Sequence, residues 1–268
     1  MPDPAHAVNL AELPGTSLGT RTVTYQEKDA ILYALAVGAA ASELDLVFER
    51  ELRVLPTFAL TLGLWVADAV SELGAFVPAE ALHGSQQLQA HCALPRAGEV
   101  SVSGQVEKVW DTGRHAIIDV RADSDWFSAV YSVILLRRGG FGGPRPPRAT
   151  PPTQFSPAGS MTVMPQAAAL YRLTGDRHLI HIDPAAALAA GFDRPILHGL
   201  ATLGMTARHL AGAFGSHPAD LQSLSARFVG PVFPGDRLDV EAADGTFHVS
   251  VGDRTVLTGT VSYSSTAG

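Results

Sequence analysis

Residues 171–201 read YRLTGDRHLIHIDPAAALAAGFDRPILHGLA and combine a cluster of acidic and imidazole side chains with the start of an apolar helix. The titratable side chains singled out in this stretch are Asp176, His178, His181, Asp183 and His198. An acid, a base and a helix N-terminus close together are the groups that move a proton beside a stabilised oxyanion. The stretch is also informative about the fold, because the helix that begins at Gly199 is apolar nearly all round and must be enclosed by other elements.

The helix expected at residues 199–214 has a counterpart at residues 58–73, which is similarly apolar and also contains small residues. Three shorter matches follow one order: AILYALAVG (30–38) with AALYRLTGD (168–176), LPTFALTLG (55–63) with ILHGLATLG (196–204), and LPRAGEVSVSGQVEKV (94–109) with VFPGDRLDVEAA (232–243). Their common order indicates an internal duplication, with chance similarity in a chain rich in Ala, Leu and Gly as the alternative.

Alternating apolar and polar residues predict strands after each helix. They are expected at 100–109, 115–121, 128–136, 223–228, 237–242, 246–251 and 255–263. We therefore expect an α+β fold in which a curved antiparallel sheet surrounds one buried helix, made twice. A Gly/Pro-rich stretch separates the copies, because its prolines exclude a helix or a central strand. We assign residues 1–138 to the first half, 139–159 to a linker and 160–268 to the second half.

The composition of the 268 residues, 46% hydrophobic and 17% charged, predicts a globular protein. A formal net charge of −7 argues against a nucleic-acid partner, because phosphates are neutralised by clustered Lys and Arg. The single cysteine, Cys92, excludes an intrachain disulfide and fits a reducing compartment. No secretory signal is recognisable, and the longest apolar run, 58–70, is too short to cross a bilayer. We therefore expect a cytoplasmic protein with no membrane partner.

Asp176 and His181 are the candidate proton-handling pair. They lie on a loop between Gly175 and the sequence Asp183-Pro184, which predicts the N-cap of an Ala-rich helix. A carboxylate and an imidazole that share one water molecule can shuttle its proton. The alternative is structural, with a loop carboxylate capping a helix beside a hydrogen-bonded histidine.

Gly199 is the candidate oxyanion site, because glycine lets an acyl group approach the free N–H groups at the helix N-terminus. Close packing of the helix on the sheet is the alternative reason for glycine there. A metal bound by Asp176, His178, His181 and Asp183 is a further alternative. However, their spacing matches no established zinc signature and no cysteine pair assists, so we expect no metal.

The stretch from Tyr171 to Pro184, followed by Ala-Gly-Phe-Asp-x-Pro-Ile-Leu-His-Gly-Leu, resembles the hydratase 2 motif of MaoC-like (R)-specific enoyl-CoA hydratases. AILYALAVGA, LPTF, LHGSQQL (82–88), LPRAG, GGFGG and ARFVGPVFPGD also resemble the hydratase domain of the peroxisomal multifunctional enzyme type 2. This resemblance covers nearly the whole chain in order. It implies a double hot-dog fold with a catalytic second half and a first half without catalytic residues.

By the same resemblance, Asp176 and His181 are the catalytic pair and the Gly199 N–H is an oxyanion donor. Supporting or substrate-binding residues implied by the motif are Tyr171, Gly175, His178, Asp183 and His198. At the positions that match Asp176 and Gly199, the first half has Gly38 and Phe58. The implied reaction is reversible addition of water to trans-2-enoyl-CoA, which gives a (3R)-3-hydroxyacyl thioester, with medium, long or bulky acyl chains.

The resemblance implies coenzyme A thioester as the substrate, no resident cofactor and a homodimer; an acyl carrier protein thioester is the alternative carrier. One departure is His178-Leu179, where the family usually has Asn-Pro. Two other functions stay open at this point: a hot-dog acyl-CoA thioesterase, and an acyl-CoA-binding protein without catalysis. The residues do not decide which member of the Asp176–His181 pair is the base, because an interacting pair titrates as a unit.

Overall fold

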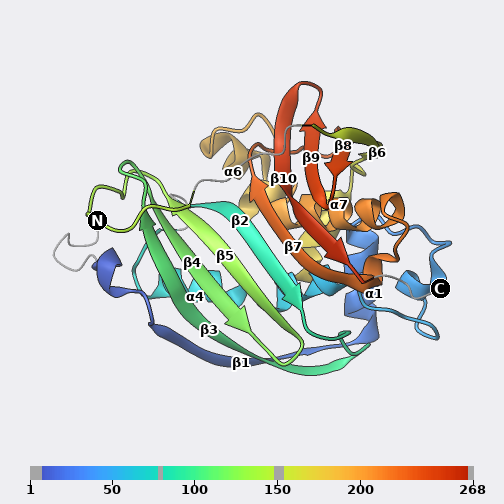
Figure 1. Cartoon of the computed structure of the whole chain (residues 1–268), viewed down its shortest axis with the longest axis horizontal. Coiled ribbons are helices and arrows are strands. Elements are labelled where there is room, and N and C mark those ends of the chain that lie inside the picture. Colours follow the sequence, from blue (N-terminus) through green and yellow to red (C-terminus); the bar gives the residue numbers. More distant parts are fainter. Residues whose placement is uncertain (1–7, 78–80, 148–153, 265–268) are drawn as a thin grey trace.

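A computed structural model describes residues 8–77, 81–147 and 154–264. Within them, the strands form one continuous antiparallel sheet in the order β1-β3-β4-β5-β2-β7-β10-β9-β8-β6 (Figure 1). The first half contributes β1 (Ser17–Tyr25), β2 (Ala81–Ala90), β3 (Gly98–Asp111), β4 (Ala116–Asp123) and β5 (Phe127–Leu135). The second half contributes β6 (Ser156–Thr162), β7 (Leu221–Phe228), β8 (Arg237–Ala243), β9 (Thr246–Val251) and β10 (Arg254–Tyr263).

Both halves have the same strand order: first, third, fourth, fifth and second. They join through their second strands, because β2 pairs with β7 from Ser85↔Arg227 to Gln89↔Ser223. This is the arrangement that an internal duplication predicts. The pairing also occupies, within one chain, the free edge of β2 in the first half and of β7 in the second. The homodimer therefore stays a prediction, and the outer edges of the sheet are β1 and β6.

The α-helices are α1 (Glu27–Ala36), α2 (Leu44–Val47), α3 (Ala59–Leu62), α4 (Trp65–Glu72), α5 (Ala167–Tyr171), α6 (Pro184–Ala189) and α7 (Gly199–Ala213). Single 3-10 turns are η2 (Leu10–Glu12), η3 (Pro56–Phe58), η5 (Arg172–Thr174), η6 (Leu179–His181) and η7 (Pro218–Asp220). The helix predicted at 199–214 is confirmed as α7, the buried helix of the second half. Among the described residues, no helix is both long and apolar enough to span a membrane.

The single helix predicted at 58–73 is wrong, since the segment divides into η3, α3 and α4. The break follows Gly63. The buried Tyr131 hydroxyl donates a hydrogen bond to the Leu60 carbonyl at 2.8 Å. In a continuous helix, that carbonyl would accept from the backbone N–H four residues later. A Cβ on Gly63 would lie 2.7 Å from that hydroxyl, so glycine is needed where the tyrosine enters the helix.

The seven strands predicted from alternation are confirmed within a few residues, whereas β1, β2 and β6 were not predicted. β1 and β6 are edge strands with mostly exposed side chains, so their sequences lack an apolar face. Since β6 begins at Ser156, the end of the segment assigned as linker, 139–159, lies in a strand. Part of that segment, residues 148–153, lies outside the described residues.

Ion pairs and a hydrogen bond connect α7 and the following turn η7 to the first half. Arg208 donates from Nη1 to both carboxylate oxygens of Glu43 at 3.0 Å and from Nε to the carbonyl of Val37 at 3.3 Å. Arg53 contacts Asp220 at 2.5 Å. These contacts hold the helix that carries the candidate site against the first half.

Arg208→Ala is expected to lower the free energy of unfolding by about 1–2 kcal/mol, because it removes a partly buried, two-oxygen ion pair and a bond to a carbonyl. Urea denaturation measures the change. Arg237→Ala is the matched control, since that arginine is 69% exposed in its pair with Asp239 and should change stability by less than about 0.5 kcal/mol. Equal losses in the two variants would show that Arg208 does not fasten the halves.

Candidate active site

The loop that carries Asp176 is shaped by local caps. Gly175 has φ +138°, a backbone conformation that side chains rarely adopt, and it turns the chain out of η5 toward Asp176. The His178 N–H then donates to Asp176 Oδ1 at 3.1 Å, while His178 Nδ1 accepts from the N–H of Ile180 at 3.4 Å at the start of η6. Asp183 Oδ1 accepts from the N–H of Ala185 at 2.8 Å, as predicted for the N-cap of α6.

His181 is presented by η6 with only 8% of its surface exposed. Its Nδ1 lies 2.9 Å from the carbonyl oxygen of Ile196, and since a carbonyl can only accept, Nδ1 carries the ring proton of the neutral form. Nε2 therefore offers a lone pair. Burial lowers the pKa of His181, an effect that the charge of Asp176 partly opposes. The ring is thus neutral at pH 7 and able to accept a proton.

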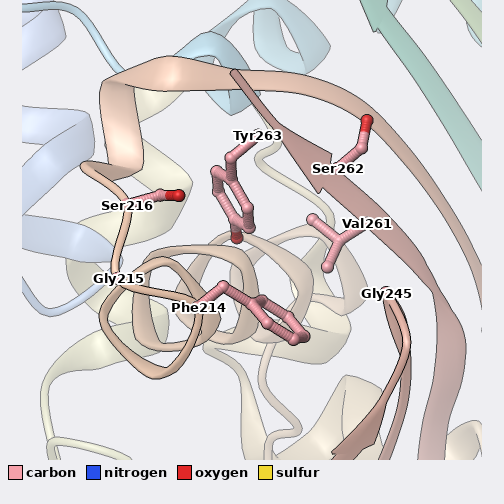
Figure 2. A pocket seen from close by; sticks show the side chains of 7 residues that line it. All are labelled: Phe214, Gly215, Ser216, Gly245, Val261, Ser262 and Tyr263. Atoms are coloured by element: carbon pink, nitrogen blue, oxygen red, sulfur yellow. The ribbon is translucent and has the colours of Figure 1, made fainter. Parts of the chain in front are cut away.

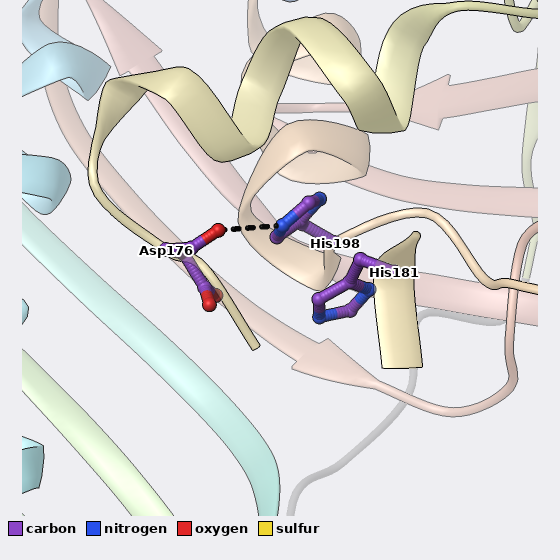
Figure 3. Close-up of side chains that lie close together, drawn as sticks. All are labelled: Asp176, His181 and His198. Carbon is purple, nitrogen blue, oxygen red and sulfur yellow. Dashed lines mark hydrogen bonds between the residues drawn. The ribbon is translucent and has the colours of Figure 1, made fainter. Parts of the chain in front are cut away.

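Asp176 and His181 share one small space. Ligand atoms of Asp176, His181 and His198 lie within 4.8 Å of one another, and the side chains of Asp176 and His181 flank that space in Figure 3. Such a separation lets one water molecule hydrogen-bond to both a carboxylate and an imidazole. The structure thus brings together the two residues that the sequence singled out for proton transfer.

His198 contacts both members of the Asp176–His181 pair. It is 1% exposed, and its Nε2 donates to the backbone carbonyl of Asp176 at 3.1 Å (dashed in Figure 3). Its ring stacks on the ring of His181, with centroids 3.6 Å apart. The centroid of the buried Tyr171 ring lies 4.9 Å from that of His198. Burial, with a further contribution from His181, lowers the pKa of His198 to about 3. The geometry gives His198 and Tyr171 a packing role.

Asp176, His181 and His198 are also residue types that bind metal ions. The Nε2 of His198 carries the proton that it donates to the Asp176 carbonyl, so only Nδ1, which is buried and has no hydrogen-bond partner among the described residues, keeps a lone pair. Ordinary zinc sites have three or four protein ligands, and the absence of a metal here stays a prediction.

Gly199 is the first residue of α7, where backbone N–H groups have no partner within the helix. A Cβ there would lie 3.1 Å from Cδ1 and Cε1 of Phe228, so a side chain would require the Phe228 ring to shift. Close packing is therefore one reason for glycine here, and the oxyanion role of its N–H stays a prediction. In the first half, Phe58 fills the matching position and packs on Tyr25 and Tyr33, with ring centroids 5.1 and 5.4 Å apart.

Two residues of the first half near Asp176 were missed from the sequence. The negative charge of Asp176 is among the causes that raise the pKa of Asp68 on α4, after burial. It also raises the pKa of His83 on β2, although burial dominates and lowers that pKa to about 4. The only signal for His83 was its place in the LHGSQQL stretch, and Asp68 stood out only as an interruption of an apolar run.

A hollow of about 420 Å³ opens at the other end of α7, between Phe214, Gly245 and Tyr263 (Figure 2). The Tyr263 hydroxyl, which points toward the helix, donates to the carbonyl of Ala207. Burial raises the pKa of this hydroxyl further above its ordinary value. It therefore stays protonated at pH 7 and does not supply a base.

Comparisons with known proteins agree with this architecture. Residues 148–267 match the model of the MaoC like domain, and residues 23–128 match that of the MFE-2 hydratase 2 N-terminal domain. The crystal structure of a MaoC-like dehydratase from Phytophthora capsici superimposes with a TM-score of 0.85 at 23% identity, over 97% of this chain and 99% of that one. A Mycobacterium tuberculosis protein described as having a double hotdog fold gives a TM-score of 0.58 at 16% identity, over 92% and 95% of the two chains.

Among curated sequences, 3-hydroxyacyl-thioester dehydratase Y of Mycobacterium tuberculosis is 38% identical over 80% of each chain. Peroxisomal multifunctional enzyme type 2 of mouse is 35% identical in sequence over a match that includes 89% of this chain. The mouse protein is longer, and the match covers 35% of its length. The fold and site thus define a double hot-dog protein of the dehydratase class. The chain belongs to the MaoC-like hydratase 2 family, as its sequence motif predicted.

Proposed function

We propose that the protein catalyses the reversible addition of water to trans-2-enoyl-CoA, giving (3R)-3-hydroxyacyl-CoA. The observation that carries this proposal is the placement of a carboxylate and a neutral imidazole within 4.8 Å of each other, on the loop hydrogen-bonded to the N-cap residue of α7. The names of the relatives, which include dehydratases and enoyl-CoA hydratases, support it. The proposed reaction uses no metal or redox cofactor.

In the proposed mechanism, the thioester carbonyl lies at the N-terminus of α7, where the Gly199 N–H and the helix dipole stabilise the negative charge that develops on its oxygen. Water between Asp176 and His181 loses a proton to one of them as its oxygen bonds to C3. A proton is delivered to C2 on the same face, and the carbonyl re-forms. His181, through the lone pair on Nε2, and Asp176, through its carboxylate, are the residues that accept and return these protons.

Crotonyl-CoA hydration tests the proposal against hydrolysis. We expect the absorbance of the conjugated enoyl thioester to fall to the hydration equilibrium without release of free thiol. Stoichiometric thiol release would instead indicate a hot-dog thioesterase. Tight binding with neither change would indicate an acyl-CoA-binding protein.

His178 is the departure from the family motif, and it lies outside the shared space as the cap of η6, with its ring 6.2 Å from that of His181. We expect His178→Asn to keep or raise activity, because asparagine also caps helices. His178→Ala should lower kcat by roughly tenfold, as for loss of a residue that orients the loop. Steady-state kinetics on crotonyl-CoA check both variants. A loss in His178→Ala as large as in His181→Ala would contradict the assignment of proton transfer to Asp176 and His181.

We also propose that the first half shapes the pocket for a medium, long or bulky acyl chain. Leu62→Trp in α3, at a buried position, should therefore lower kcat/KM for long enoyl-CoAs about tenfold more than for crotonyl-CoA. Overpacking costs about 1–3 kcal/mol, so circular dichroism must first show a folded variant. An equal loss across chain lengths would give this region a purely structural role.

The remaining proposals concern the setting of the reaction. We propose coenzyme A as the carrier, with an acyl carrier protein as the alternative, and a cytoplasmic homodimer. Kinetics with matched CoA and carrier-protein thioesters decide the first point. Light scattering decides the second, since a single monomeric species would contradict the dimer.

A further inference from the structure

A β-bulge in β2 aims His83 at the interior. His83 and Ser85 pair with consecutive residues of β5, so Gly84 is an extra residue in the strand. A Cβ on Gly84 would lie 2.6 Å from side-chain atoms of Ile134, so a larger residue at the bulge would require Ile134 to move. The extra residue turns His83 to the inner face of the sheet, the face that carries the buried Tyr131. Bulges that redirect a side chain in this way are common beside active sites.

One nitrogen of the inward-facing imidazole, Nε2, lacks a hydrogen-bond partner among the described residues. The ring packs edge-on against Phe228 with centroids 4.8 Å apart and lies 6.1 Å from the ring of Tyr131. Its Nε2 is buried. Burial lowers the pKa of His83 to about 4, so the ring is neutral at pH 7. A buried polar atom without a partner destabilises a fold and calls for a ligand or water to complete it.

His83 is connected with the candidate active site, across the junction of the halves, by charge and by a shared packing partner. It interacts with the charge of Asp176, which belongs to the second half. The same Phe228 ring that covers His83 contacts the N-terminus of α7, where it lies 3.1 Å from the Cβ position of Gly199. His83 and the N-terminus of α7 therefore contact the same aromatic ring, in the region where the second half is proposed to hold water and thioester.

We propose that His83 is a third catalytic residue, supplied by the first half, whose Nε2 hydrogen-bonds the water molecule that adds to the enoyl thioester. This inference rests on the proposed hydration reaction. An acyl chain offers nothing for a ring nitrogen to bond, and the thioester carbonyl has the N–H of Gly199. Water beside Asp176 is the reactant that remains. The first half then does more than shape the acyl pocket, in contrast to the expectation from its missing Asp–His motif.

The test replaces His83 with side chains of similar size. His83→Leu should lower kcat by about 10–100-fold with KM nearly unchanged, and by the same factor for short and long enoyl-CoAs. Its melting temperature should equal or exceed that of the wild type, because a buried atom without a partner is gone. His83→Gln, whose amide nitrogen can take the place of Nε2, should keep kcat within about fivefold of the wild type.

Tyr131→Phe is the matched control, because Tyr131 lies on the same inner face of the sheet as His83. It removes the bond to the Leu60 carbonyl and should lower the melting temperature while leaving kcat within about twofold. A His83→Leu variant with lowered stability and unchanged kcat would overturn the inference, as would a loss that grows with chain length. If the wild type itself fails to hydrate crotonyl-CoA, the proposed function is wrong. An active wild type with an equally active His83→Leu variant contradicts the role of His83 alone.

Discussion

Replacing Asp176 with asparagine is expected to lower kcat for enoyl-CoA hydration by about 10²–10⁴-fold, the range typical for loss of a general acid or base. The substitution removes proton transfer and little else. Asparagine keeps an oxygen that can accept from the His178 N–H, and the backbone carbonyl still accepts from His198. The loop should therefore keep its shape, and the loss should fall on the chemical step.

Steady-state kinetics on crotonyl-CoA and thermal unfolding together check this result. Asp193→Asn is the matched control, since Asp193 is an exposed carboxylate of the same segment and its replacement should leave kcat within about twofold. A folded Asp176→Asn variant with near-wild-type hydration would remove Asp176 from the mechanism.

His181→Ala should lower kcat by a similar factor, about 10²–10⁴-fold, for a different reason. The variant loses the imidazole whose lone pair is directed, by a bond from Nδ1 to Ile196, into the space beside Asp176. The wild type should also stay active in mild acid. Burial lowers the pKa of His181, so the neutral, proton-accepting form persists below the ordinary histidine range near pH 6.5. Activity falls only as the pH drops through this lowered pKa.

The pH dependence of kcat/KM tests this assignment, because it reports groups of the free enzyme. Loss of the bond to Ile196 and of stacking on His198 also costs stability, so unfolding must be measured alongside. His91→Ala serves as the control, because His91 is an exposed imidazole just after the end of β2. An acid limb above pH 6.5 in the wild type would contradict a buried neutral His181 as the proton acceptor.

Local sequence predicted the second-half helix and the seven strands that alternate in polarity. Their burial patterns depend only on residues that are adjacent in the sequence. The break in the first-half helix could not, because its cause is the hydroxyl of Tyr131, a residue 71 positions from Leu60. The proximity of Asp176 and His181 was foreseen from their spacing. His83 was not, because its direction depends on a bulge at Gly84 and on pairing across the two halves.

The stereochemistry of the product distinguishes (R)-specific hydration from the other possible reactions. Wild-type protein is incubated with trans-2-enoyl-CoA, and the 3-hydroxyacyl-CoA formed is resolved by chiral chromatography while free thiol is assayed in parallel. We expect the (3R) product alone, with no thiol released and with its formation slowed by about 10²–10⁴-fold in the Asp176→Asn variant. A (3S) product, or free coenzyme A, would contradict the proposed function.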